Sequence, residues 1–228
     1  MCFSATGSFA VAAGLAGIGA VALRRTKPPS HRLFAVIPLL FAIQQIAEGM
    51  VWLTMPSQES RLHHAAVDAF LIFAVVVWPT WVPLCLVPIE REPRRKRALR
   101  LLLALGACVS LYAGWLLFQG QPVAKIESHS LAYDYSKSGN GLVLALYLPV
   151  YVTASVLPFF ISSMEKAKLM GVVLVGALVA TFIIKRATLT STWCFFAAIL
   201  SGIIVLSLAA EQRGHVARRA AAAAPGNV

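Results

Sequence analysis

The sequence is poor in charged residues, and in acidic ones most of all. Only 13% of its 228 residues are charged, against about 25% in an average soluble domain, and 9 Asp and Glu stand beside 20 Lys and Arg. At the same time 59% of the residues are hydrophobic, and the mean hydropathy is +0.76. A compact water-soluble globule could not bury that much apolar surface, so the composition excludes a water-soluble enzyme.

Motifs of several enzyme and cofactor classes are missing as well. No two of the four cysteines, Cys2, Cys85, Cys108 and Cys194, form a C-x-x-C pair, which excludes zinc ribbons and thioredoxin-like sites. The sequence has no P-loop and no nucleophile elbow. The last apolar run has no lysine for a retinal Schiff base, and the histidines lie at the ends of apolar runs or between them, not inside helices where a haem would need them. We therefore expect no retinal, haem or nucleotide cofactor.

Long hydrophobic runs are what the sequence has in abundance. A helix needs about 20 apolar residues to cross the hydrocarbon core of a bilayer. Seven runs come close to that length, at 4–23, 33–54, 65–88, 98–118, 141–162, 168–184 and 191–209. The sequence therefore predicts an all-α, polytopic membrane protein with a single seven-transmembrane-helix bundle over 1–212 and a disordered cytoplasmic tail over 213–228.

The basic residues indicate how these helices are oriented. If the N-terminus is outside, fifteen of the Lys and Arg fall in cytoplasmic segments and five in outer ones, as the positive-inside rule requires. We therefore predict an N-terminus outside and a C-terminus in the cytoplasm. Basic clusters between apolar runs fit cytoplasmic loops better than a nucleic-acid surface, and the cluster Arg91–Arg100 is expected to contact anionic lipid headgroups. No nucleic-acid partner is expected.

Glu48 is the most informative residue, because it lies inside the second apolar run. A charge near the bilayer centre costs roughly 2.5–3.5 kcal/mol on insertion scales, so an acid at this depth is a candidate for a functional site. Gln44, Gln45 and Trp52 follow helical spacing and form one polar stripe with it, which must face protein or water. We favour a ligand site here over the alternative, a structural hydrogen-bond cluster that holds the bundle together.

A second group of polar residues marks the outer start of the third run. His64 and Asp68 stand at i and i+4 and share a helix face, next to His63. A carboxylate beside an imidazole suits a metal ligand with its orienting partner, or a proton relay. The alternative is a pair of solvated interfacial histidines at a helix end, and for this group taken alone it is the better interpretation.

The predicted topology brings scattered polar residues to the outer half of the bundle. The loop between the fourth and fifth runs, about 119–140, is either a lid over a site or a flexible connection. The ligand-pocket candidates are Glu48, Gln44, Gln45, Trp52, Asp68, His129 and Trp193. The metal-ligand candidates are Cys2, His63, His64 and Cys194. Because zinc and copper take Cys, His and carboxylate ligands, these residues predict a transition-metal ion (zinc or copper) as cofactor.

Tryptophan and proline cluster toward the inner end of the third run. The segment Trp78–Pro83 reads Trp-Pro-Thr-Trp-Val-Pro. Proline inside a helix kinks it, and tryptophan is enriched at membrane interfaces. We predict a kinked end of the third span with an interfacial aromatic belt.

Four segments of the chain have distinctive sequences. They are Met1–Ala5 (MCFSA), Ile43–Gly49 with Trp52 after it, Trp78–Pro83, and Trp193–Phe196. In these segments the chain resembles a family of bacterial multi-pass membrane proteins with no established activity, and the opening pentapeptide is the most specific part of the resemblance. The resemblance spans most of the chain and implies a seven-helix bacterial membrane protein. It also supports grouping Cys2, Glu48 and Cys194, but it implies no reaction.

We therefore expect a protein of the bacterial cytoplasmic (inner) membrane with an outward-facing polar pocket that binds a metal ion or a small ligand, for transport, sensing or conduction. Two alternatives stay open. One is a metal-dependent enzyme acting on lipid at the outer leaflet, with Glu48 as general base for a metal-bound water. The other is a structural subunit of a larger membrane complex, in which the polar residues serve only helix packing. A homo-oligomer is compatible with each of these functions.

Overall fold

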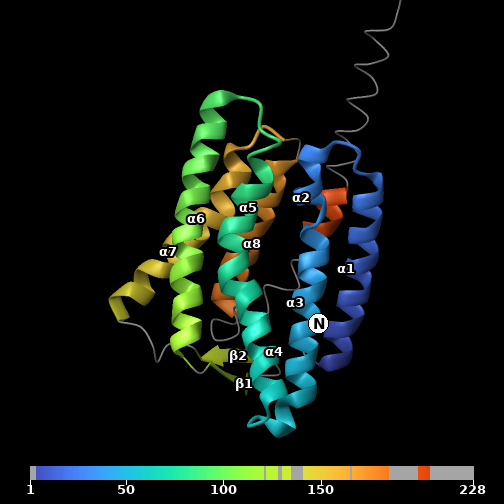
Figure 1. Cartoon of the computed structure of the whole chain (residues 1–228), viewed down its shortest axis with the longest axis vertical. Helices are drawn as coiled ribbons and strands as arrows, with labels where there is room; N and C mark the ends of the chain where they lie inside the picture. The colour runs from blue at the N-terminus through green and yellow to red at the C-terminus, as the bar shows by residue number, and fades with distance from the viewer. Residues whose placement is uncertain are drawn as a thin grey trace, which may run out of the picture.

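The computed structural model describes residues 4–120, 122–127, 130–134, 141–164, 166–184 and 200–205, and this part of the chain is mostly helical (Figure 1). The α-helices are α1 (Ala5–Arg25), α2 (Arg32–Ala35), α3 (Ile37–Thr54), α4 (Arg61–Leu71), α5 (Trp78–Leu86), α6 (Pro93–Gln119), α7 (Gly141–Ile161) and α8 (Ala167–Ile184). Residues 200–205 are also helical. The remaining elements are the 3-10 turns η1 (Pro29–His31) and η2 (Met55–Ser57), the π-helix η3 (Ile72–Val77), and the strands β1 (Val123–Glu127) and β2 (Ser130–Asp134).

Four helical stretches are long and apolar enough to cross a bilayer. They are Ala5–Arg25, Pro29–Ser57, Arg61–Leu86 and Pro93–Gln119, and they confirm the helical character of the first four predicted runs. Helices α7 and α8 coincide with the fifth and sixth runs, while most of the seventh run lies outside the described residues. The four long helices suggest a multi-pass membrane protein.

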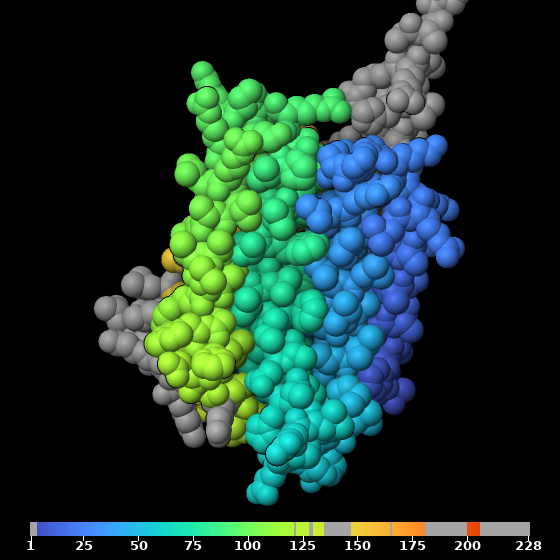
Figure 2. Space-filling view, in the orientation of Figure 1, coloured from blue at the N-terminus to red at the C-terminus, as the bar shows by residue number. Residues whose placement is uncertain are grey.

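Helices α1 and α3 run antiparallel and lie against each other along their length (Figure 1). Two glycines permit this close approach. A Cβ at Gly19 would lie 2.5 Å from the Leu39 side chain, and a Cβ at Gly49 would lie 2.8 Å from the Phe9 ring. The two contacts set the register of the pair. In the space-filling view the surfaces of α1, α3, α5 and α6 continue side by side across one face of the molecule (Figure 2).

The third span is not one continuous α-helix. Its middle is the π-helix η3, and Pro79, which follows at the start of α5, has no backbone N–H to continue the ladder. Hydroxyl groups of α6 and α7 donate to three carbonyl oxygens of η3: Tyr151 to Ala74 at 2.8 Å, Tyr147 to Val75 at 3.0 Å, and Ser110 to Val76. In an apolar setting such bonds replace those that water would make. They also tie α6 and α7 to the middle of the span.

Helix α6 comes especially close to this break. A Cβ at Gly106 would overlap the carbonyl group of Pro79, so the position requires glycine. Beside it, the hydroxyls of Thr80 and Ser110 lie 2.7 Å apart and form a hydrogen bond. The backbone of α6 therefore packs directly on α5 where the third span changes its helical form.

A β-hairpin occupies much of the predicted loop at 119–140. Strands β1 and β2 pair antiparallel, with Val123 opposite Asp134. The hairpin packs on α4, because Tyr133 stacks on Phe70 with ring centroids 4.6 Å apart and Leu131 is fully buried. The described fold is thus mostly helical rather than all-α, since this polar segment still carries enough apolar side chains on one face to pack as a hairpin.

Basic residues gather at one end of the bundle. The connection after α1 and the connection between α5 and α6 both lie there, at the top of Figure 1. The connection between α7 and α8 lies at the same end, because the backbone N–H of its Ser163 donates to Glu90. The basic residues of these segments are Arg24, Arg25, Lys27, Arg32, Arg91, Arg94, Arg95, Lys96, Arg97, Arg100, Lys166 and Lys168. Within the described ranges, the opposite end, with η2 and the hairpin, carries Arg61 and Lys125.

Candidate functional site

Three polar side chains of α3 are buried together inside the bundle. Glu48 is 0% exposed, Gln45 1% and Gln44 2%. The side-chain amide Nε2 of Gln45 donates to the carboxyl Oε2 of Glu48 at 3.0 Å. The polar stripe therefore faces protein rather than lipid. Gln44 and Gln45 lie at the middle of α3, and Glu48 lies in the half that leads to η2, away from the basic end.

Trp78 connects this polar stripe to the third span. Its indole Nε1 donates to Oε1 of Gln44 at 3.0 Å, and its ring stacks on Phe41 with centroids 4.0 Å apart. Trp78 is buried in the hydrophobic core, so the prediction that it belongs to an interfacial belt is wrong. The physical reason is that its indole N–H donates to an acceptor inside the bundle, so it does not require water or headgroups at the interface as acceptors.

Two further polar groups are buried near the stripe without a hydrogen-bond partner in the described part of the chain. They are Ser8 Oγ on α1 and Trp52 Nε1 on α3. Trp52 stands four residues after Glu48, and Ser8 precedes Phe9, whose ring lies against Gly49. Both groups therefore lie within about one helical turn of Glu48 along the bundle. A buried donor without an acceptor is unfavourable, and a bound ligand would remove that cost.

The histidines at the start of α4 have different surroundings. His63 is buried, and its Nδ1 lies 2.9 Å from Oγ1 of Thr54 at the end of α3. His64 is exposed, and its Nδ1 donates to the carbonyl oxygen of Ser60 at 3.0 Å. The two rings meet edge to face with centroids 6.2 Å apart, and Asp68 is exposed one turn further along. These contacts join the ends of α3 and α4. The helix-end alternative predicted that both histidines are solvated; His64 is exposed, but His63 is buried.

No metal site is found among the described residues, where no three His, Cys, Asp or Glu side chains come together around one point. Of the predicted metal ligands, Cys2 and Cys194 lie outside the described residues, as do the pocket candidates His129 and Trp193. The candidates that the structure does describe fall into two places, the buried stripe of α3 and the start of α4.

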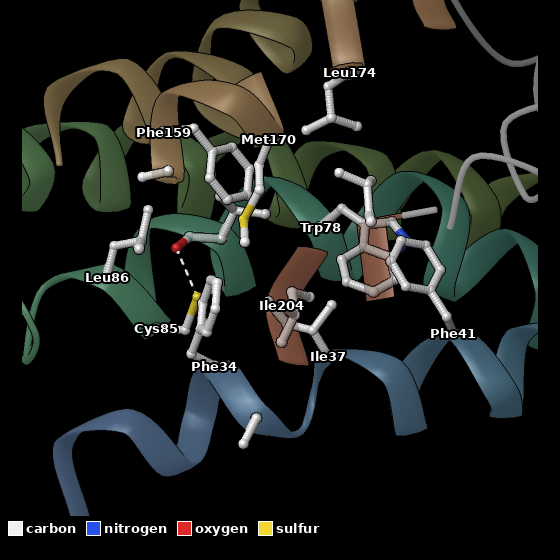
Figure 3. Packing of buried hydrophobic residues seen from close by; sticks show 14 of the residues in the cluster. Phe34, Ile37, Phe41, Trp78, Cys85, Leu86, Phe159, Met170, Leu174 and Ile204 are labelled. Carbon is white, nitrogen blue, oxygen red and sulfur yellow. Dashed lines mark hydrogen bonds between the residues drawn. The ribbon is translucent and has the colours of Figure 1, made fainter. Parts of the chain in front are cut away.

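A cavity lies between α3, α5, α7, α8 and residues 200–205. Its water-accessible volume is about 40 Å³, within about 470 Å³ of unfilled space that includes its open mouth. Aromatic and aliphatic side chains form its wall, among them Phe41, Trp78, Phe159 and Met170 (Figure 3). Because Trp78 also bonds to Gln44, it belongs to both the cavity and the polar stripe.

A second buried glutamate, Glu90, is 2% exposed and joins two connections at the basic end. Its Oε1 accepts from the backbone N–H groups of Arg91 and Glu92, both at 3.0 Å, and from the hydroxyl of Ser163 at 2.8 Å. Its Oε2 accepts from the backbone N–H of Ser163 at 2.7 Å. Burial opposes ionisation, but these hydrogen bonds outweigh it and hold the pKa of Glu90 below its ordinary value.

The sequence did not predict a role for Glu90, because its partner Ser163 lies 73 residues later in the chain. Nothing local distinguishes it from a solvated acid beside a basic cluster. The one available signal is its position directly before that cluster, after the apolar run has ended.

Comparison with known proteins places the chain in a family. Residues 1–222 match the family of unknown function DUF6629, and the chain belongs to it. No curated protein and no solved structure matches the chain. The buried stripe around Glu48, the cavity beside it and the Glu90 cluster are therefore the observations from which function has to be inferred.

Proposed function

We propose that this DUF6629 protein is a seven-span protein of the bacterial cytoplasmic membrane, with one transmembrane domain over 1–212 and a cytoplasmic tail over 213–228. Its N-terminus is outside and its C-terminus inside. The support is the gathering of basic residues at one end of the described bundle, as on the cytoplasmic side of membrane proteins. Helices α7 and α8, with 21 and 18 residues, are close to the length of about 20 that a span needs.

The basic end would then meet the headgroups of anionic lipids. Within the cluster Arg91–Arg100 most of the basic side chains are exposed, while Glu90 and Glu92 are engaged by backbone N–H groups. Each Lys or Arg near an anionic surface contributes about 1 kcal/mol of attraction. This interaction anchors the inner ends of the helices and has no part in the ligand site.

The function we propose is the binding of a small polar ligand at Glu48, in the outer half of the membrane, for transport, sensing or conduction. The observation that carries it is the complete burial of Glu48 with Gln44 and Gln45 in a helix long enough to span a bilayer. Burying these groups costs free energy, and apolar side chains of similar size would pack as well. A ligand that uses the polar groups accounts for them where packing does not.

The groups near Glu48 indicate the chemistry of the ligand. The carboxyl of Glu48 can accept from a cationic N–H group, while Ser8 Oγ and Trp52 Nε1 can donate to an oxygen atom. A small zwitterion offers both kinds of group. A bare metal ion fits less well, because an indole N–H cannot coordinate it.

Thermal unfolding of the full-length protein in detergent tests this proposal. The probes are the zwitterions glycine and glycine betaine, together with methylammonium and Zn²⁺. We expect a zwitterion at saturation to raise the Tm of the wild type by about 5 °C. The same rise is expected for Glu59→Gln, which removes an exposed acid at the same end, and no rise is expected for Glu48→Gln.

The proposal is contradicted if no probe raises the Tm of the wild type, or if a zwitterion raises the Tm of Glu48→Gln by the same amount. Stabilisation by Zn²⁺ that disappears in the double variant Cys2→Ser, Glu48→Gln would instead favour a metal site. Elemental analysis of zinc and copper in the purified wild type and in that double variant decides this arm. About one metal ion per chain in the wild type and none in the variant would show that the ligand is a metal ion and not a zwitterion.

A further inference from the structure

The cavity beside Trp78 has a chemistry different from that of the polar stripe. Among the described residues its wall carries no Asp, Glu, His, Lys or Arg: apart from Trp78, Tyr151 and Ser155 it is made of apolar side chains. An ionised headgroup would lose its hydration there and find no opposite charge. A neutral group therefore suits this cavity better than an ionised one.

Among the polar groups of the wall, Ser155 is the one left without a partner. The indole of Trp78 donates to Gln44, and the hydroxyl of Tyr151 donates to the carbonyl oxygen of Ala74. Ser155 is 6% exposed, yet its Oγ has no hydrogen-bond partner within the described ranges. A buried serine in a helix often bonds to the carbonyl oxygen four residues earlier, and Ser155 does not. Its hydroxyl is thus available to a bound molecule.

Water is a poor occupant of this space. The water-accessible volume of about 40 Å³ exceeds the roughly 10–15 Å³ that a water molecule needs. However, a buried water is held by about two to four polar partners, and this wall offers the Ser155 hydroxyl. A short alkyl segment, by contrast, gains dispersion contacts with the apolar wall. The open mouth leaves room for the remainder of such a chain to extend out of the cavity.

We propose that this cavity binds a neutral single-chain amphiphile, whose oxygen bonds to Ser155 and whose alkyl chain lies against Phe41, Trp78 and Phe159 (Figure 3). A fatty alcohol is the simplest member of this class. The inference goes beyond the ligand site at Glu48 and does not depend on it. The two sites share Trp78 but are tested through different residues.

Photolabelling of the full-length protein in lipid vesicles tests the inference, with octanol that carries a diazirine as the probe. Met170 lines the cavity, whereas its neighbour Leu169 is 48% exposed and reports on probe dissolved in the bilayer. Mass spectrometry locates the label. We expect unlabelled octanol to compete at Met170 but not at Leu169.

Variants of Ser155 sharpen the result. Ser155→Ala keeps the space but removes the hydroxyl, and should lower the labelling of Met170 by up to about tenfold. Ser155→Leu fills the cavity and should abolish that labelling. Leu157→Ala, at an exposed position of the same helix, is the matched control and should leave it unchanged. Thermal unfolding of each variant shows whether it is folded. The competition with unlabelled octanol is measured on the wild type and so does not depend on the folding of any variant.

Octanoate with the same diazirine tests the preference for a neutral group. It should label Leu169 but not Met170. The proposal is overturned if unlabelled octanol does not reduce the labelling at Met170, or if octanoate labels Met170 as strongly as octanol does. Equal labelling of the wild type and Ser155→Ala overturns the role of the hydroxyl. None of these outcomes alters the response of Glu48→Gln to zwitterions, so the two proposals fail separately.

Discussion

Glu48 and Glu90 are both buried glutamates, but their surroundings differ in kind. Glu48 lies in a helix long enough to span a membrane and accepts from a side-chain amide of the same helix, that of Gln45. Glu90 lies at the basic end and accepts from backbone N–H groups of two separate connections. Burial alone therefore does not distinguish the ligand-binding acid that we propose at Glu48 from an acid that serves the fold.

The kind of donor makes the distinction. Backbone N–H groups are fixed in place by the fold, so a carboxylate that satisfies them becomes part of the fold. A side-chain amide can rotate toward a ligand, and the buried Ser8 hydroxyl and Trp52 N–H lie at about the same level of the bundle as Glu48. We therefore expect the loss of Glu90 to reduce stability, and the loss of Glu48 to reduce binding.

The largest effect is expected for Glu90→Ala. It should lower the free energy of unfolding by about 3 kcal/mol, because three backbone N–H groups and the Ser163 hydroxyl lose their acceptor. Titration with SDS in detergent measures this change. Glu92→Ala is the matched control: Glu92 is exposed and caps α6, and its loss should cost about 1 kcal/mol. Equal losses in the two variants would contradict the special role of Glu90.

A pH dependence should follow from the same bonds. Burial raises the pKa of Glu90, but the hydrogen bonds from Glu92, Ser163 and Arg91 outweigh burial and bring it below the ordinary 4.5. Folding therefore favours the ionised form. Its contribution to stability is fully present above about pH 4.5 and is lost as the pH falls through the folded-state pKa. Unfolding titrations at several pH values should show that the free energy of unfolding falls more steeply on acidification in the wild type than in Glu90→Gln. Parallel profiles for the two proteins would refute this.

A smaller effect is expected at the turn that Glu90 holds. Lys166 has a φ of 65°, in the left-handed region that glycine adopts without strain. Lys166→Gly should therefore raise the free energy of unfolding by about 1 kcal/mol. Lys168→Gly, just inside α8, should instead lower it, since glycine destabilises a helix. The same SDS titration compares the two, and a change of the same sign in both would show that the backbone at Lys166 carries no strain.

The smallest effect on stability is expected for Glu48→Gln. Glutamine keeps an oxygen that can accept from the Gln45 amide, and it removes the cost of burying an ionisable group. The free energy of unfolding should change by less than about 1 kcal/mol, while stabilisation by zwitterions is lost. A destabilisation as large as that of Glu90→Ala would make Glu48 a structural residue and remove the contrast between the two acids.

Local patterns in the sequence were enough to predict the long helices and the buried stripe. An apolar run of about 20 residues is a property of one segment, and so is the helical spacing of Gln44, Gln45 and Glu48. Because a membrane cannot satisfy such groups, their burial inside protein follows from the run itself. The helix-end interpretation of His63 and His64 also used local spacing. Their contacts with Thr54 and Ser60 do lie at helix ends, but His63 is buried and not solvated as that interpretation held.

The rest depends on contacts between distant parts of the chain. The buried Trp78 donates to Gln44, which lies 34 residues earlier in the chain. Glu90 accepts from Ser163, which lies 73 residues later. The π-helix and the cavity likewise arise from packing between elements, and so does the packing of the hairpin on α4. Pairwise contacts of this kind cannot be read from one sequence.

Modification by dicyclohexylcarbodiimide tests the difference between the two acids most directly. This apolar reagent modifies carboxyl groups in apolar surroundings and leaves an N-acylurea, which mass spectrometry locates. We predict that it modifies Glu48, that a stabilising zwitterion prevents this modification, and that Glu90, ionised and hydrogen-bonded to backbone N–H groups, stays unmodified. Modification of Glu90 in place of Glu48, or modification of Glu48 that no zwitterion reduces, would contradict the assignment of a ligand site to Glu48.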